Sequence, residues 1–430
     1  MTLTAMQKYK TYKWSGNPFF GDIPSCWDIF PLLKVAKIKS IINKQDEELL
    51  SVYLDRGVIK FSDVDEKRTN VTSLDLSKYQ FVENGDFVLN NQQAWRGSVG
   101  VSEYIGIVSP AYLVLSLSKE INSKYANYLF RDGSMVSQYL ICSKGVGTIQ
   151  RNLYWPHLRR TIIALPSYNE QNAIANFLDE KTSLIDDAIA IKEKQIELLN
   201  ERKKILIQQT VTQGLDPTVP MTDSGVTWIG KIPAHWEVRR SKFVFCQRKE
   251  RARADDVQLS ATQAYGVIPQ EQYEEIIGRR VVKISFHLEK RKHVEIDDFV
   301  ISMRSFQGGL ERAWASGCIR SSYVVLRPVN KDEVDAGFFS YMLKLPTYIN
   351  ALQMTASFIR DGQDLNFDNF AQVDLFIPPI EEQKAIFYAI QSKVDEINKS
   401  IALFTDQITK YQEYKTTLIN SAVTGKIKVV

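Results

Sequence analysis

The sequence predicts two copies of an α/β (α+β) domain joined by two long helices in an antiparallel coiled coil, which gives the chain an internal pseudo-twofold repeat. Two observations carry this prediction. Short motifs recur at a nearly constant offset, and a long segment with a helical apolar period closes each copy. The 430 residues also exceed what one hydrophobic core usually serves.

The repeat is clearest in two motifs. A Gly-x-Ile-Pro-x-x-Trp-acid motif occupies residues 21–28 and returns at 230–237, an offset of 209 (230 minus 21). A Pro-x-x-x-Glu-Gln motif occupies residues 166–171 and returns at 378–383, an offset of 212 (378 minus 166). The same frame is therefore built twice along the chain.

The inserts between these motifs, residues 30–164 and 239–376, share little sequence beyond short fragments. Both contain short β-branched or aromatic runs bounded by Gly, Pro and Asn, for example at 87–89 and 299–301, as strands do. We therefore expect the inserts to share a mixed α/β fold while presenting two different surfaces.

Each copy ends in a segment in which apolar residues recur alternately three and four positions apart. Nine of the ten seam positions in the second segment are apolar or aromatic, and six of ten in the first. This is the pattern of a coiled coil. The predicted seam contains Leu178, Ile185, Ile189, Ile196, Leu199 and Leu206 in the first segment and Ile390, Ile397, Ile401, Ile408 and Leu418 in the second.

A helix of about 40 residues is roughly 60 Å long, too long for one face to be covered by a small domain. Each helix therefore needs the other beside it. We expect an antiparallel pair, because a parallel pair would crowd the two domains together; the alternative is that each helix packs only on its own domain. Lys203 and Lys415 occupy equivalent seam positions, where a lysine either fixes the register or reaches out to solvent.

These patterns divide the chain into four parts. Residues 1–164 form the first domain with its N-terminal frame, and 165–214 the first long helix. Residues 215–376 form a linker and the second domain, and 377–430 the second long helix. Gly214 and Gly425 mark the ends of the helices, where glycine is favoured.

Composition indicates a globular protein of ordinary character. The net charge of +4 and pI near 8.6 are only mildly basic, so the distribution of charge matters more than its total. The four cysteines are scattered without a Cys-x-x-Cys pair, which favours reduced thiols over disulfides or zinc. The chain has no apolar run of 18 residues and its start lacks the regions of a signal peptide, so we predict a cytoplasmic protein.

The sequence contains no catalytic, cofactor-binding or metal-binding pattern that we would assign. Residues 225–231 have the spacing of a phosphate-binding loop, but Ile232 stands where that loop needs a hydroxyl. The repeat equivalent, residues 16–22, has an acid in place of the lysine. The glycines and histidines elsewhere lack the context of a dinucleotide or zinc site.

The inserts instead gather basic and amide side chains with aromatics and glycines in predicted loops. Arg pairs with guanine through two hydrogen bonds, Gln pairs with adenine, and Lys or Arg also binds phosphates. The alternative for any one of them is a solvated surface charge. The candidates are Gln92, Arg96, Lys144 and Arg151 in the first insert and Arg304, Gln307, Arg312, Arg320, Arg360 and Gln363 in the second.

The candidate side chains suit contacts with double-stranded DNA, and two further features bear on this prediction. The same position after a predicted strand has a long polar side chain next to glycine in both copies. These residues are Arg96-Gly97 in the first copy and Gln307-Gly308-Gly309 in the second. Residues 248–253 are a locally basic run, which either contacts phosphates or is a solvated strand end.

Together the two repeated motifs and the long helices resemble the specificity subunits of type I restriction-modification systems, over nearly the whole chain. The resemblance implies two target-recognition domains that each read one half of a split DNA site, with two helices as a ruler between them. It implies no catalytic activity in this chain.

The resemblance also implies partners. These are two copies of a DNA adenine modification (methyltransferase) subunit and, through them, ATP-dependent restriction subunits, in the cytoplasm of a bacterium or archaeon. S-adenosylmethionine, ATP and magnesium are expected in those partners and none in this chain. The recognition loops of this family vary, so the candidate residues above rest on loop position and chemistry alone.

Two other classes stay open on the sequence. A stand-alone DNA-binding regulator or scaffold would show the same basic loops, but would not need a duplicated helix-start motif. An enzyme with an unassigned site would require acidic metal ligands or a cofactor loop, which the sequence does not display.

Overall fold

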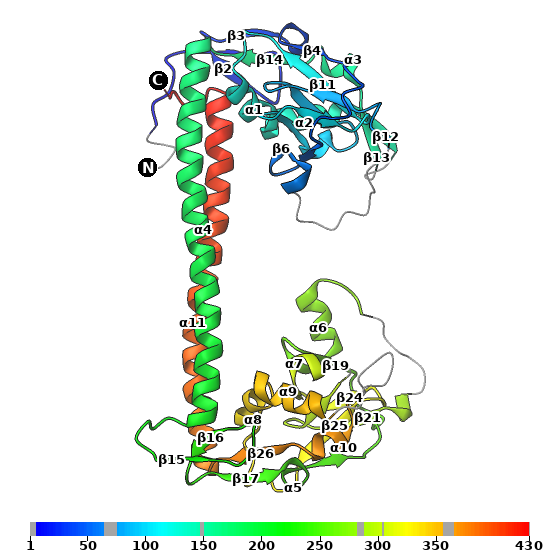
Figure 1. Ribbon diagram of the computed structural model, residues 1–430, viewed down its shortest axis with the longest axis vertical. Helices are drawn as coiled ribbons and strands as arrows, with labels where there is room; N and C mark the ends of the chain where they lie inside the picture. The colour runs from blue at the N-terminus through cyan, green and yellow to red at the C-terminus, as the bar shows by residue number, and fades with distance from the viewer. Residues whose placement is uncertain are drawn as a thin grey trace. The chain divides into compact units, whose positions relative to one another are not determined.

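The computed structural model of the chain describes residues 6–63, 75–146, 150–281, 288–302, 305–355 and 365–429. The chain divides into two compact units, unit 1 being Met1–Glu193 with Phe404–Val430 and unit 2 being Lys194–Leu403. Each unit therefore contains one α/β domain and one stretch of each long helix (Figure 1). Within the described ranges, no helix is long and apolar enough to cross a membrane.

The domain of unit 1 is built on a four-stranded antiparallel sheet in the order β4-β11-β8-β9. Its strands are β4 (Ala36–Ile38), β8 (Phe87–Asn90), β9 (Val99–Val101) and β11 (Tyr112–Leu117). The two-stranded antiparallel pairs are β1 (Tyr12–Trp14) with β2 (Asp22–Pro24), β3 (Asp28–Pro31) with β14 (Ile162–Leu165), β5 (Leu50–Tyr53) with β6 (Gly57–Lys60), β7 (Gln80–Val82) with β10 (Gly106–Val108), and β12 (Ser143–Val146) with β13 (Gln150–Leu153). The helices are η2 (Leu32–Lys34), η3 (Phe61–Asp63), η4 (Ala94–Arg96), α1 (Ser123–Arg131), α2 (Gly133–Ile141) and α3 (Trp155–Leu158).

The domain of unit 2 repeats this topology around a sheet in the order β18-β25-β22-β23. Its strands are β18 (Phe245–Arg248), β22 (Phe299–Ile301), β23 (Glu311–Arg312) and β25 (Val324–Pro328). The two-stranded antiparallel pairs are β15 (Met221–Asp223) with β16 (Lys231–Pro233), β17 (Glu237–Arg240) with β26 (Asp374–Ile377), β19 (Leu259–Thr262) with β20 (Gly266–Pro269), and β21 (Lys292–Val294) with β24 (Gly317–Ile319). The helices are α5 (Ser241–Val244), α6 (Gln270–Ile277), η5 (Leu288–Lys290), α7 (Ser305–Gly308), α8 (Ala336–Met342), α9 (Pro346–Met354) and α10 (Phe367–Ala371).

The two inserts thus share one topology, as predicted, although their sequences share little. Each sheet covers a small apolar core, with Val88 and Val114 in the first domain and Val300 and Val325 at the equivalent strand positions in the second. Because a buried strand needs apolar volume rather than a particular residue, the fold is retained while the sequence diverges.

Two glycines also mark the equivalence of the inserts. A Cβ on Gly106 would lie 2.3 Å from the Glu48 carbonyl oxygen, and one on Gly317 would lie 2.4 Å from the Val257 carbonyl oxygen. The backbone of β10 or β24 approaches the neighbouring segment so closely that only glycine fits in either copy.

The long helices are α4 (Tyr168–Gln213, 46 residues) and α11 (Ile380–Val423, 44 residues). In unit 1 the start of α4 shares a core with the end of α11, through Leu178 and Leu418. In unit 2 the end of α4 shares a core with the start of α11, through Val211 and Ile390. The helices therefore form an antiparallel coiled coil, and all eleven predicted seam residues are buried or half-buried.

The seam lysines make the same interhelical contact in both units. Lys415 Nζ donates to the Asp186 carboxylate at 2.6 Å in unit 1, and Lys203 Nζ donates to Asn398 Oδ1 at 2.9 Å in unit 2. Both residues of each pair are related by the offset of 212 (415 minus 203, 398 minus 186). Neither lysine simply reaches solvent, because each binds a polar partner on the opposite helix.

Candidate nucleic-acid interface

A buried glutamine fixes each α/β domain to its long helix. Gln171 Nε2 donates to the Glu120 and Pro166 carbonyls, and its Oε1 accepts the Asn122 backbone N–H at 2.8 Å. Asn122 is in turn the N-cap of α1. This network ties the first turn of α4 to helix α1 of the first α/β domain.

The second copy repeats this attachment atom for atom. Gln383 Nε2 donates to the Glu333 and Pro378 carbonyls, and its Oε1 accepts the N–H of Asp335, the N-cap of α8, at 2.8 Å. The repeated Glu-Gln motif therefore fixes each of the two α/β domains to its long helix in the same way.

In the first domain the structure brings the two predicted loops together. Gln92 and Arg96 lie at η4, directly after β8, while Lys144 and Arg151 lie on the β12–β13 hairpin. The Leu153 backbone N–H of that hairpin donates to the Asn91 carbonyl at 3.0 Å, which joins it to the η4 loop. Candidates from two well-separated segments of the sequence thus share one edge of the domain.

Aromatic side chains order the cations at this edge. The Arg96 and Arg151 guanidinium carbons lie 4.6 and 5.8 Å from the Trp95 ring centroid. Lys144 Nζ lies 4.2 Å from the centroid of the Tyr154 ring. Gln92, Arg96 and Lys144 are exposed and Arg151 is half-buried, so this edge presents cations and aromatic faces to solvent. Sequence reasoning missed Tyr154, for which only its position after the hairpin was a signal.

A cleft of about 930 Å³ begins beside Arg96 and extends toward the helices of unit 1. Arg131, from the end of α1, lines it and donates to the Leu54 and Asp55 carbonyls in the β5–β6 turn. Burial lowers the pKa of the Arg131 guanidinium. Sequence reasoning missed Arg131, because its role depends on carbonyls about 76 positions away.

In the second domain the candidates lie in different settings. Gln307 is exposed on α7, which follows β22 as η4 follows β8, and Arg320 is exposed in the turn after β24. Arg312 donates from Nε to Asp297 Oδ1 at 2.8 Å, its side chain is only 15% exposed, and it lies over the Trp314 ring. This geometry favours a structural role for Arg312. The remaining candidates, Arg304, Arg360 and Gln363, lie outside the described residues.

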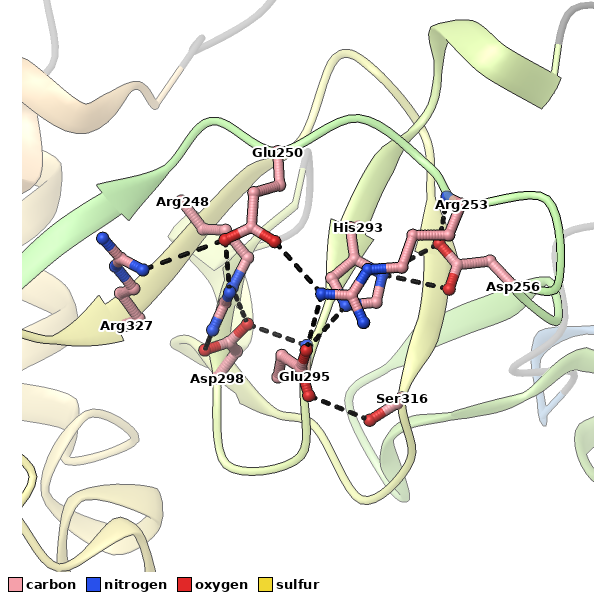
Figure 2. Close-up of polar contacts among 9 residues, drawn as sticks. All are labelled: Arg248, Glu250, Arg253, Asp256, His293, Glu295, Asp298, Ser316 and Arg327. Carbon is pink, nitrogen blue, oxygen red and sulfur yellow. Dashed lines mark hydrogen bonds and ion pairs between the residues drawn. The ribbon is translucent and has the colours of Figure 1, made fainter.

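Acids pair with two of the four cations in the basic run at 248–253, whereas Lys249 and Arg251 are exposed. Arg248 is buried and pairs with Asp298 at 2.7 Å and with Glu250 at 2.7 Å. Arg253 pairs with Glu295 at 3.1 Å. Figure 2 shows these residues as one polar network, to which the β21–β22 turn contributes Glu295 and Asp298.

His293 lies at the centre of this network and is 1% exposed. Its Nδ1 contacts the Asp256 carboxylate at 2.9 Å and its Nε2 contacts Glu295 Oε1 at 2.9 Å. Burial by itself lowers the pKa of His293, but the hydrogen bonds to Asp256 and Glu295 outweigh burial and raise the pKa above its ordinary value. Each ring nitrogen thus faces a carboxylate oxygen, an arrangement that favours the protonated imidazole.

The first domain has an equivalent buried cation that pairs with two carboxylates. Lys39 pairs with Asp86 and with Glu83 at 2.6 Å, at the positions of Arg248, Asp298 and Glu295. Phe81 stands in place of His293, and the Lys39 ammonium lies 5.3 Å from its ring centroid. The buried pair therefore belongs to the shared fold, whereas the histidine is particular to the second domain.

The fold and its exposed loops define a duplicated binding scaffold, in which one frame carries two domains of equal topology and unlike polar edges. No protein-family model matches the chain. The chain is 22% identical, over 95% of its length and 95% of the relative's, to the putative type I restriction enzyme MjaX specificity subunit of Methanocaldococcus jannaschii. It is 23% identical, over 95% of its length and 94% of the relative's, to the type I restriction enzyme MjaVIII specificity subunit of the same organism.

Solved structures agree with these relatives. A chain from a structure described as the basis of complex assembly and conformational transition of the type I R-M system matches with a TM-score of 0.65 and 12% identity, covering 93% of this chain and 98% of that one. The HsdS subunit of Thermoanaerobacter tengcongensis matches with a TM-score of 0.53 and 14% identity, covering 94% and 98%. The predicted resemblance to the specificity subunits of type I restriction-modification systems is thus confirmed, and the chain has their fold.

Proposed function

We propose that this chain is the DNA sequence-specificity subunit of a type I restriction-modification complex, in which each of the two target-recognition domains reads one half of a split, asymmetric DNA site. One observation carries the proposal. Two domains of the same topology, fixed to the helices by identical contacts of Gln171 and Gln383, present different polar edges. Such a scaffold is suited to reading two unlike half-sites with one geometry.

The chemistry of the first edge supports contact with DNA. Forked Arg donors and the Gln amide suit base edges in the major groove, and the lysine ammonium suits phosphates. Aromatic rings beside the cations hold them in place without neutralising their charge. We propose further that the antiparallel helices set the spacing between the half-sites.

The pseudo-twofold repeat supports binding of two identical modification subunits. Ile191 on α4 in unit 1 and Leu403 on α11 in unit 2 are related by the offset of 212 (403 minus 191) and are 59% and 55% exposed. Two apolar side chains at equivalent exposed positions are suited to two copies of one partner surface. In this proposal the modification subunits bind S-adenosylmethionine and methylate adenine. The restriction subunits join the complex through them and use ATP and magnesium. This chain has no catalytic role.

The test is single-molecule sequencing of methylated adenines in DNA from cells that express this chain with its modification subunit. Matched cells lacking only this chain are the control. A split motif with two short half-sites around a fixed gap, present only with the chain, is the expected result. If the complex assembles and no chain-dependent methylation appears, the proposal is wrong and a stand-alone DNA-binding regulator becomes the better account.

A further inference from the structure

Three residues at the first recognition edge form one cluster whose parts come from two separate segments. Trp95 and Arg96 lie on η4, and Arg151 lies on β13. Both guanidinium groups lie against the Trp95 ring, at 4.6 and 5.8 Å from its centroid. The ring is itself fixed, because Trp95 Nε1 donates to the Gln92 carbonyl at 3.0 Å.

Neither guanidinium is neutralised by an acid in the part of the chain that the structure describes. Arg248, Arg253 and Arg312 of the second domain differ, since each pairs with a carboxylate at 3.1 Å or less. An arginine that is held by an aromatic face keeps its charge and its forked donors available to a ligand.

We propose, on the basis of the function proposed above, that Trp95 is a positioning residue that holds Arg96 and Arg151 at the reading edge, and that this pair reads guanine in the half-site of the first domain. The forked guanidinium matches the O6 and N7 acceptors of guanine, which is the commonest specific contact between a side chain and a base. A lysine would keep the charge but lose the fork. The second domain has no such pair among its described residues.

The experiment first sequences the motif that the complete complex methylates. A chimera in which residues 30–160 are replaced by the corresponding domain of a relative identifies the half-site of the first domain. We expect at least one guanine in that half-site. A motif without guanine there overturns the inference and leaves the proposed function intact, whereas the absence of any chain-dependent motif overturns both.

The second step tests the cluster itself with Trp95→Phe, Trp95→Leu, Arg96→Lys and Arg151→Lys in the complete complex. Trp95→Leu and at least one lysine variant should lower methylation of the cognate site about 10-fold or more and relax the preference for guanine. Trp95→Phe keeps a ring and should retain methylation within about threefold. Unchanged base preference in the other half-site, read by the same molecules, shows that the variants are folded.

The third step removes one acceptor from the DNA. Replacing the guanine by 7-deazaguanine should weaken binding of the wild-type complex about 10-fold. One of the two arginines should contact N7, and its lysine variant should bind the guanine and 7-deazaguanine sites equally. If every variant instead lowers binding equally on all sequences and only reduces its salt dependence, the arginines bind phosphates and the inference is wrong.

Discussion

The indole N–H of Trp236 donates to Glu382 at 3.1 Å, which joins the two motifs that recur along the chain. Trp27 makes the same bond to Glu170 at 3.3 Å in the first copy. The glycine that ends a long helix lies against each tryptophan, Gly214 beside Trp236 and Gly425 beside Trp27. Each junction therefore combines the start of one long helix with the end of the other.

Gly425 should be the glycine at which a methyl group is least tolerated in this junction. Its φ is +72°, and a Cβ would lie 2.3 Å from Pro24 Cδ. Gly425→Ala should lower the free energy of unfolding by about 3 kcal/mol, from backbone strain and overpacking together. Gly225→Ala is the matched control, since Gly225 has φ +71° and no atom lies within 4 Å of the place a methyl group would take, and it should cost about 1 kcal/mol. If urea unfolding shows the same loss of unfolding free energy for both variants, the close contact between Gly425 and Pro24 is contradicted.

His293 should make the stability of the second domain depend on pH. Because its pKa is raised in the folded state, the stabilisation is complete below the unfolded pKa of about 6.5 and is lost as the pH rises through the higher folded value. Thermal unfolding of the full chain between about pH 6 and pH 9 should therefore show a transition that weakens with rising pH.

His293→Phe, which copies Phe81 of the first domain, should remove this pH dependence. It should also destabilise the domain at low pH by about 2 kcal/mol, since Asp256 loses its partner in a buried position. His157→Phe, at an exposed position, is the control and should leave the profile unchanged. A pH profile that survives in His293→Phe would assign the effect to another group.

Two leucines on α11, one buried in the seam and one exposed, allow the contribution of seam packing to stability to be measured. Leu418 is fully buried in the core of unit 1, whereas Leu403 is 55% exposed. Leu418→Ala should cost about 3 kcal/mol of unfolding free energy, and Leu403→Ala less than about 0.5 kcal/mol. Circular dichroism during chemical unfolding distinguishes the two, and similar costs would argue against the seam.

The equivalent exposed residues Ile191 and Leu403 should contribute to binding of the modification subunits. Glutamate at both positions should leave the fold intact and weaken assembly about 10-fold or more in titration calorimetry. Leu184→Glu is the control, because Leu184 is 57% exposed but its repeat equivalent is already Glu396 (396 minus 184 is 212). Normal assembly of the Ile191 and Leu403 variant would place the partner surface elsewhere.

Replacement of residues 30–160 by the corresponding domain of a relative should change one half of the methylated motif only. The exchange keeps Gln171, which bonds backbone groups at residues 120 and 122, so the foreign domain can form the same attachment to α4. Sequencing of methylated adenines reports the result. A change in both half-sites would mean that the domains do not read independently.

The arrangement of polar partners could not be predicted from the sequence. Arg96 and Arg151 share Trp95 only because β13 is bonded to the loop before η4. Arg312 was a candidate for DNA contact and Arg248 lay in the basic run, yet each pairs with a carboxylate in the folded domain. Such pairings depend on strand register and on contacts between distant segments, which local patterns do not encode.

The sequence by itself determined the duplicated frame, the two long helices and their apolar seam, because a repeated motif and a helical period are local properties of a chain. The sequence also indicated that the repeated Glu-Gln pair, Glu382 and Gln383 in the second copy, marks the start of a long helix. It did not indicate which groups these side chains bind. Only the tertiary structure decided which polar partners meet, with Arg96 and Arg151 against the Trp95 ring and Arg248 and Arg312 each paired with a carboxylate. The physical reason is that burial and charge pairing are set by which segments the fold brings together, not by which residues are neighbours in the chain.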